Sequence, residues 1–170
     1  LILTPPSLVN QWKEELSTKF DLDFKEVGNE KEWENTSLAI ASIDKVKNFN
    51  ASTNEFKHSK AHEIYWDIII IDEAHKLKDK KTFRWRFVDK LQKKRLLLLT
   101  ATPFQNDLIE LYNLLSLLRR GHLGTISEFR SSFLVNGNER QPLNPLELKR
   151  KLSEVMIRRR RDEVKGIKYM

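Results

Sequence analysis

The stretch Asp67-Ile-Ile-Ile-Ile-Asp-Glu-Ala-His-Lys-Leu-Lys-Asp79 decides the fold. Its four consecutive isoleucines predict a strand buried on both faces, as in a parallel sheet covered by helices. Asp72 and Glu73 follow where this strand ends. Because ligands of open α/β sheets bind at the carboxyl ends of the strands, these two adjacent carboxylates are candidates for metal and water chemistry.

Upstream of this strand, short apolar runs flank a helical pattern. Leu1–Leu3 and Leu38–Ser42 predict buried strands, and residues 22–27 predict another short one. The segment Lys45–Glu63 is polar and predicts irregular or weakly helical structure. An amphipathic helix with Ser7 near its cap is expected between the first two strands, because apolar residues recur there at every fourth position: Leu8, Trp12, Leu16 and Phe20.

Downstream, the strand-and-helix alternation continues. Apolar residues at helical spacing predict a helix over 83–91, and Arg95–Thr100 predicts another buried strand. Asp107 and Glu110 have the spacing of a capping box ahead of an apolar helix over 108–118. Arg119, Arg120 and Gly121 are expected to close that helix.

The pattern changes beyond Gly124, where no further strands are expected. Residues 126–133 and 145–156 predict helices, the second capped by Asn144. The predicted fold is therefore α/β, a mostly parallel sheet flanked by helices with a helical C-terminal extension. We place the main domain at residues 1–121 and the extension at residues 122–170.

Composition points to a folded protein with a nucleic-acid partner. Hydrophobic residues make up 39% of the 170 and charged residues 32%, and no apolar run approaches the roughly 20 residues that cross a bilayer. With no cysteine, the chain forms no disulfide, which suits a cytosolic location. The net charge of +7 gathers in two blocks, Lys76–Arg95 and Lys149–Lys168. Such blocks favour a polyanionic partner, although either one alone could be a solvated helix face.

The residues at the strand ends suit phosphoryl transfer. Asp72 could hold a hydrated magnesium ion through water, and Glu73 could orient or deprotonate an attacking water. His75 could relay hydrogen bonds to Thr100 and Thr102 at the end of a neighbouring strand. Simpler interpretations remain open, namely solvated acids, a surface histidine and a Thr-Pro turn. Two exposed amides that could contact a phosphate backbone or a partner lobe, or be ordinary turn residues, follow the turn: Gln105 and Asn106.

Three segments together resemble motifs Ia, II and III of the Swi/Snf-type ATPases, which are superfamily 2 helicase-like proteins that translocate on double-stranded DNA. They are Thr4-Pro-Pro-Ser-Leu-Val-Asn-Gln-Trp12, Ile71-Asp-Glu-Ala-His-Lys-Leu-Lys78 and Leu99-Thr-Ala-Thr-Pro-Phe-Gln-Asn106. The run Met156-Ile-Arg-Arg-Arg-Arg-Asp-Glu-Val164 also resembles the arginine-rich segment that closes the family's first lobe. The likeness covers nearly the whole chain.

The resemblance implies a RecA-like first lobe that uses ATP and Mg²⁺. Asp72 would be the magnesium residue through water, Glu73 the catalytic base, and His75 with Thr100 and Thr102 the couplers of hydrolysis to movement. The implied partners are double-stranded DNA and a second RecA-like lobe of the same full-length chain, without a membrane, in the nucleoid of a prokaryote or the nucleus of a eukaryote. The residues implied along the nucleic-acid face are Pro5, Ser7, Gln11, Trp12 and Ser42.

One family motif is missing from the sequence. None of the five glycines begins the phosphate loop Gly-x-x-x-x-Gly-Lys-Ser/Thr, which in the family precedes motif Ia. The family's second lobe, with its arginine finger, is missing as well, and such an arginine is worth ~10³ or more in rate. We therefore expect the sequence to begin part-way through a fold, and the chain alone to bind ATP weakly and to hydrolyse none detectably.

Two alternatives to a DNA-stimulated ATPase motor stay open. One is the motor of a strand-separating or restriction-type superfamily 2 helicase, which would share motif II. The other is a non-catalytic nucleic-acid-binding or protein-binding module whose carboxylates are vestigial. For Arg158 and Arg159, contacts between lobes or structural bracing are favoured, because arginine forks suit carboxylate partners.

Overall fold

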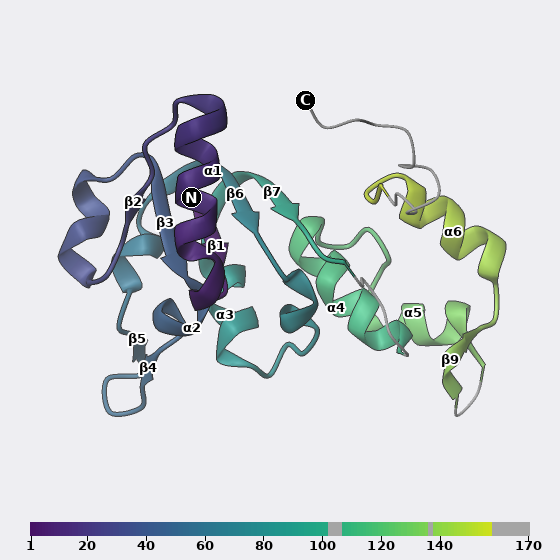
Figure 1. Ribbon diagram of the computed structural model, residues 1–170. Coiled ribbons are helices and arrows are strands. Elements are labelled where there is room, and N and C mark those ends of the chain that lie inside the picture. Colours follow the sequence, from purple (N-terminus) through teal and green to yellow (C-terminus); the bar gives the residue numbers. More distant parts are fainter. Residues whose placement is uncertain (102–106, 136–137, 158–170) are drawn as a thin grey trace.

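The computed structural model describes residues 1–101, 107–135 and 138–157, and it places a five-stranded sheet at the centre of the main body (Figure 1). Every pairing in this sheet is parallel, which confirms the predicted α/β class. In spatial order the strands are β2 (Lys25–Glu26), β3 (Ala39–Ser42), β1 (Ile2–Thr4), β6 (Tyr65–Ile71) and β7 (Gln92–Leu98).

Helices cover both faces of the sheet. On one face, α1 (Val9–Phe20) packs Val9, Trp12 and Leu16 against Ile2 and Ile40. The larger core lies on the other face, against the helices α2 (Ile43–Val46), α3 (Phe83–Lys90) and α4 (Leu108–Leu118). Four 3₁₀ turns complete the described main body: η1 (Pro6–Leu8), η2 (Glu30–Asn35), η3 (Ser59–His62) and η4 (Ala74–Leu77).

Strand β6 is buried fully on only one face, which corrects the prediction from its isoleucines. Ile69 and Ile71 are at most 1% exposed in the larger core, and Ile70 packs in the α1 cluster. Ile68, in contrast, is 44% exposed, because α1 covers the centre of the sheet and does not reach this part of β6. Leu97 of β7 is 45% exposed, since within the described residues β7 is the edge strand.

Two short hairpins were not predicted. The polar segment 45–63 contains β4 (Phe49–Asn50) paired antiparallel with β5 (Glu55–Phe56). Beyond Gly124, where strands were expected to stop, β8 (Leu134–Val135) pairs with β9 (Asn138–Pro142). Such short strands carry too few residues for a period to show. The first hairpin is held by aromatic packing between Phe49 and Phe56, whose ring centroids lie 5.2 Å apart.

The predicted helix caps are only partly confirmed. Ser7 makes no capping bond, because the 3₁₀ turn η1 precedes α1. Asp107 does cap α4 by accepting from the Ile109 N–H at 2.7 Å, whereas Glu110 pairs with Lys78. The amide of Asn144, expected to cap the last helix, instead donates to the Ser132 carbonyl at 2.7 Å.

The C-terminal helices α5 (Ile126–Phe133) and α6 (Pro145–Ser153) share a second core with α4 (Figure 1). Leu111 and Leu115 of α4 point into this core, while Leu114 and Leu117 of the same helix belong to the sheet core. The domain boundary at residue 121 remains a prediction. Helix α4 packs against residues from both sides of this boundary. Among the described residues, no helix combines the length and the apolar character needed to span a membrane.

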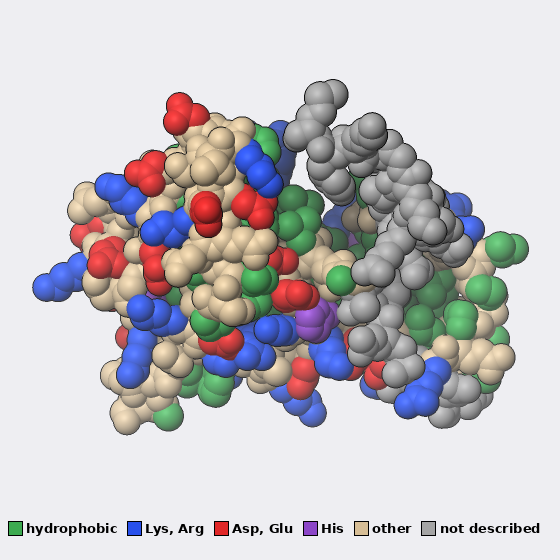
Figure 2. All heavy atoms as spheres, in the orientation of Figure 1, with side chains coloured by type: hydrophobic (Ala, Val, Ile, Leu, Met, Phe, Trp, Pro, Cys, Tyr) green, Lys and Arg blue, Asp and Glu red, His purple; other side chains and the backbone are tan. Residues whose placement is uncertain are grey.

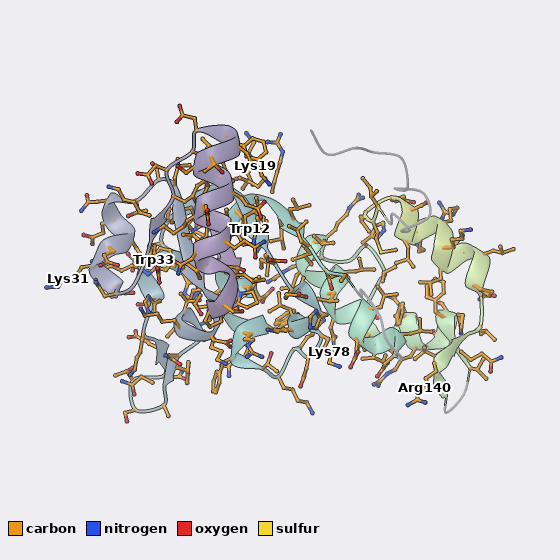
Figure 3. All side chains as sticks on the ribbon, in the orientation of Figure 1. Trp12, Lys19, Lys31, Trp33, Lys78 and Arg140 are labelled. Carbon is orange, nitrogen blue, oxygen red and sulfur yellow. The ribbon has the colours of Figure 1, made fainter. Side chains whose placement is uncertain are left out.

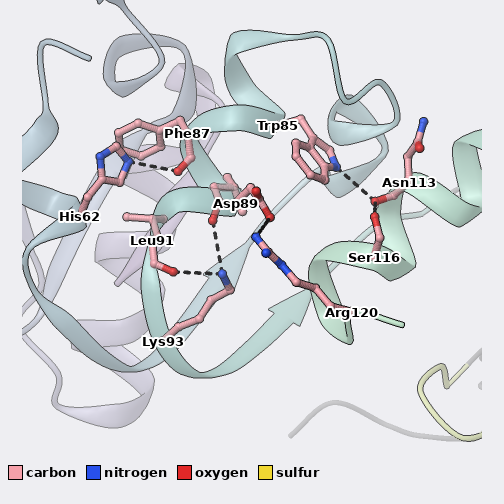
Figure 4. A network of polar contacts seen from close by, with 10 residues as sticks. His62, Trp85, Phe87, Asp89, Leu91, Lys93, Asn113, Ser116 and Arg120 are labelled. Atoms are coloured by element: carbon pink, nitrogen blue, oxygen red, sulfur yellow. Dashed lines mark hydrogen bonds and ion pairs between the residues drawn. The ribbon is translucent and has the colours of Figure 1, made fainter. Parts of the chain in front are cut away.

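Polar contacts fasten α3 to β7 and α4 (Figure 4). Trp85 donates its indole N–H to the Asn113 carbonyl at 3.1 Å, and Arg120 pairs with Asp89 at 2.7 Å. Between these two positions of α3, His62 contacts the Phe87 carbonyl at 3.1 Å through Nε2. Burial lowers the pKa of His62, so the neutral ring is favoured and donates this bond.

Candidate functional site

The carboxyl ends of four neighbouring strands come together at one edge of the sheet. Thr4 ends β1 opposite Ser42 of β3, and Asp72 follows β6 with its N–H bonded to the Leu3 carbonyl at 2.9 Å. The Ala74 N–H then donates to the Leu99 carbonyl at 2.9 Å, just beyond β7. The acidic residues after β6 are therefore held by the strands on both sides.

Hydrogen bonds hold both oxygens of the Asp72 carboxylate. Oδ1 accepts from the Glu73 backbone N–H and Oδ2 accepts from the Trp12 indole N–H, both at 2.8 Å. Figure 3 shows Trp12 on the side of α1 that lies toward β6. The sequence did not predict the bond to Trp12. The only signal was that an indole N–H on an apolar helix face needs a partner, and nothing in the pattern identifies Asp72 as that partner.

Glu73 points away from Asp72 because its backbone is left-handed. Its φ of 51° and ψ of 44° lie in a region that residues other than glycine rarely adopt. This turn brings the Glu73 Oε2 to 2.9 Å from the His75 Nδ1. The two adjacent carboxylates thus have different surroundings, one toward α1 and one toward His75.

His75 also connects Glu73 to the neighbouring strand end. Its Nδ1 lies 3.5 Å from the Thr100 Oγ1, which follows β7. The structure therefore brings together Glu73, His75 and Thr100, as the sequence analysis expected. The other proposed coupling and amide residues, Thr102, Gln105 and Asn106, lie outside the described residues, as do Arg158 and Arg159.

The residues assigned to a nucleic-acid face differ in their exposure. Ser7 and Gln11 are exposed on η1 and α1, whereas Pro5 is buried. Trp12 is half-buried and bonded to Asp72. Ser42 is 7% exposed, and within the described residues its Oγ has no hydrogen-bond partner. A phosphate could reach this hydroxyl only after its neighbours move, so Ser7 and Gln11 are the accessible members of the set.

The basic segment Lys76–Arg95 is partly engaged inside the fold. Lys80 lies over the Tyr112 ring at 4.6 Å, and burial lowers its pKa. Arg84 binds Asp44, which also accepts from Lys47. Burial alone would raise the pKa of Asp44, but these hydrogen bonds outweigh it and hold the pKa below its usual value. On the face in Figure 2, basic and acidic side chains are interspersed.

The donor set at the end of β6 fits magnesium bound chiefly through water. Within residues 1–101, 107–135 and 138–157, no three histidine, cysteine or acidic side chains cluster as a metal cage. Mg²⁺ usually keeps several waters and binds one or two carboxylates together with substrate phosphates. A carboxylate offers about four lone-pair sites, so each Asp72 oxygen can accept a further bond.

Comparisons with known proteins agree with this geometry. The chain is 43% identical over 164 residues to a Bacillus subtilis (strain 168) protein named as an uncharacterized ATP-dependent helicase, YqhH. The match covers 96% of this chain and 28% of the relative. The chain is 31% identical to the ATP-dependent helicase BRM of Arabidopsis thaliana, over 98% of this chain and 8% of that protein. The chain thus spans only a minor part of these relatives.

A solved structure shares the fold. The Sulfolobus solfataricus SWI2/SNF2 ATPase core in complex with dsDNA superposes with a TM-score of 0.75 at 27% identity, over 93% of this chain and 33% of that chain. These matches confirm the Swi/Snf-type resemblance carried by the three sequence motifs. The model of the SNF2-related domain matches residues 1–169, so this chain belongs to the SNF2-related domain family.

Proposed function

We propose that this chain is part of an ATP-dependent motor that moves on double-stranded DNA. The observation that carries the proposal is the divergence of Asp72 and Glu73 at the end of β6, where one carboxylate is held toward α1 and the other toward His75. Its relatives are named as ATP-dependent helicases, and the structural neighbour is an ATPase core in complex with dsDNA. The proposed partners are double-stranded DNA and a second RecA-like lobe, in the nucleoid or the nucleus.

The roles proposed for the residues follow from their surroundings. Asp72, with lone pairs remaining on both oxygens, would hold a water of hydrated Mg²⁺. Glu73 would accept a proton from the attacking water, and His75 would fix the orientation of the Glu73 carboxylate. Magnesium–ATP, when bound, supplies the γ-phosphoryl group and neutralises the developing charge.

The contacts of His75 support a coupling role. Its Nδ1 lies 2.9 Å from the Glu73 Oε2 and 3.5 Å from the Thr100 Oγ1. A displacement at the end of either strand would therefore alter the contacts of His75 with the other. We propose that Thr100, with Thr102, Gln105 and Asn106, connects hydrolysis to movement. On the nucleic-acid side, the exposed Ser7 and Gln11 would make direct contacts, with Pro5, Trp12 and Ser42 shaping the surface beneath.

The test compares Glu73→Gln with wild type in the full-length protein that contains this chain. Removing the base should lower DNA-stimulated ATP hydrolysis about 10²-fold or more. The matched control is Glu34→Gln, because Glu34 is an exposed glutamate paired with Lys60 in the η2–η3 region, away from the residues of the site. Turnover that survives in Glu73→Gln, or falls equally in both variants, would contradict the assigned role.

Two further arms address the partner and the chain itself. Binding to duplex DNA should weaken steeply with salt and show little sequence preference, because phosphate contacts release counterions. Binding that ignores salt would assign the basic segments to solvation or to contacts between lobes. The 170 residues alone should hydrolyse no ATP detectably in a malachite-green assay, and Mg²⁺-dependent turnover that requires Glu73 would refute this.

A further inference from the structure

Trp12 and Asp72 are joined by a hydrogen bond that spans 60 positions of sequence. The indole Nε1 lies 2.8 Å from the Asp72 Oδ2, a short distance for an N–H···O bond and in the range of bonds to charged acceptors. An indole N–H can only donate and a carboxylate can only accept, so the direction of the bond is fixed. The bond therefore constrains the carboxylate without adding a charge to it.

The Trp12 ring is itself held in place. It packs in the cluster formed between α1 and the sheet, together with Val9 of the same helix and Ile70 of β6. Val9 is 4% exposed, which anchors the first turn of α1 on the sheet. A ring packed in this way has few alternative rotamers, so its N–H is presented to Asp72 in one direction.

The second oxygen of Asp72 is held by the Glu73 N–H at 2.8 Å. That N–H belongs to the residue with left-handed backbone, so its direction is also set by the turn. Rotation of the Asp72 carboxylate would break one or both bonds. The remaining lone pairs therefore keep a fixed orientation at the carboxyl end of β6, where the proposed function places magnesium–nucleotide.

We propose that Trp12 is a positioning residue that orients the Asp72 carboxylate toward hydrated magnesium. The inference rests on the proposed function and deepens it, because it assigns to the metal site a residue from the helix that also carries an accessible nucleic-acid candidate. Gln11 is adjacent to Trp12 and exposed on α1. A displacement of α1 by a partner is therefore transmitted to Asp72 through one hydrogen bond.

Trp85 provides a matched control. Its indole N–H also donates one hydrogen bond, at 3.1 Å to the Asn113 carbonyl, and its ring is also half-buried (Figure 4). Trp85→Phe and Trp12→Phe thus delete the same group from similar environments and keep an aromatic ring for packing. Only Trp12→Phe removes a bond to Asp72, so a difference between the variants reports on the carboxylate.

The experiment uses the full-length protein and Mn²⁺ as the probe, in the presence of a non-hydrolysable ATP analogue. Binding of Mn²⁺ is followed by electron paramagnetic resonance, which needs no turnover. Trp12→Phe should weaken Mn²⁺ binding about tenfold, as removal of hydrogen bonds to metal ligands does elsewhere. The Mg²⁺ concentration for half-maximal ATP hydrolysis should rise by the same factor. Trp85→Phe should match wild type in both measurements.

A second measurement reads the response of the wild-type protein itself. The four tryptophans of this chain can be labelled as 5-fluorotryptophan in the wild-type protein, and the fluorine signals assigned by substitution. Addition of Mg²⁺ with the ATP analogue should shift the Trp12 signal and leave that of Trp85 in place. If the Trp12 signal does not move, or Trp12→Phe binds Mn²⁺ as wild type does, the inference is wrong.

The outcomes separate this inference from the proposed function. A wild-type protein that binds Mn²⁺–nucleotide while Trp12→Phe is unchanged overturns the positioning role alone. A wild-type protein that binds no Mn²⁺–nucleotide and hydrolyses no ATP overturns the proposed function and this inference together.

Discussion

Replacement of His58 should reveal how much a single buried hydrogen bond contributes to this fold. The Trp33 indole donates to the His58 Nδ1 at 3.1 Å, and the two side chains are 1% and 6% exposed. His58→Leu removes the acceptor and leaves a buried N–H without a partner, which costs about 1–3 kcal/mol. For a chain of this length, 2 kcal/mol corresponds to a fall in Tm of about 4–8 °C. His58→Asn, whose side-chain oxygen can occupy the Nδ1 position, should lose less.

The same pair makes stability depend on pH. Burial is the main cause that lowers the pKa of His58 below its usual 6.5, with nearby Glu30 opposing the shift and Lys45 adding to it. The unfolded chain therefore binds more protons than the folded chain in this range. The contribution of His58 is fully present above about pH 6.5 and is lost as the pH falls toward the folded pKa.

Thermal melts of the 170-residue chain, followed by circular dichroism at about pH 8 and about pH 5, test both statements. Wild type should lose more Tm on acidification than His58→Leu, which retains the contributions of His62 and of the Leu1 ammonium group, whose pKa values are lowered in the same direction. Equal Tm values for His58→Leu and His58→Asn, or an unchanged pH dependence in His58→Leu, would refute the reasoning.

Four further substitutions, arranged as two pairs, probe the backbone and the core. Gly121 and Gly124 both have positive φ, so alanine at either should lower the free energy of unfolding by about 1 kcal/mol. At Gly124 the new Cβ would also lie 2.7 Å from the Glu128 carboxylate that caps α5. This second effect should add about 1 kcal/mol to the loss measured by urea unfolding. Equal losses for the two would show that the cap does not matter. Phe87→Ala should lower the free energy of unfolding by about 3–5 kcal/mol because the ring is 0% exposed. Phe83→Ala should lower it clearly less in the same measurement, because Phe83 is 44% exposed.

Periodic segments were predicted well from the sequence. The helix α5 has the predicted bounds, and α4 agrees with its apolar run, because each pattern is long enough to define one face. The exposure of Ile68 could not be predicted, since an apolar run does not say how far a helix reaches across a sheet. The hairpin at Phe49 depends on an aromatic partner from elsewhere in the chain, Phe83, stacked at 4.9 Å.

The candidate site shows the same division. The sequence placed Asp72 and Glu73 correctly at a strand end, because strand ends follow from local pattern. It could not show the left-handed backbone of Glu73, which separates the two carboxylates. Nor could it show the bond from Trp12, since the direction of a ring on a helix face is decided by the strands beneath it.

The position of β7 at the edge of the described sheet has a consequence for solubility. An edge strand presents unpaired amide and carbonyl groups that can recruit a strand from another molecule, and lysine or arginine side chains discourage this. Lys94 and Arg95 are exposed and protect the first half of β7, whereas the second half presents Leu97. Resistance of this chain to aggregation therefore depends on what lies against the leucine half of that strand.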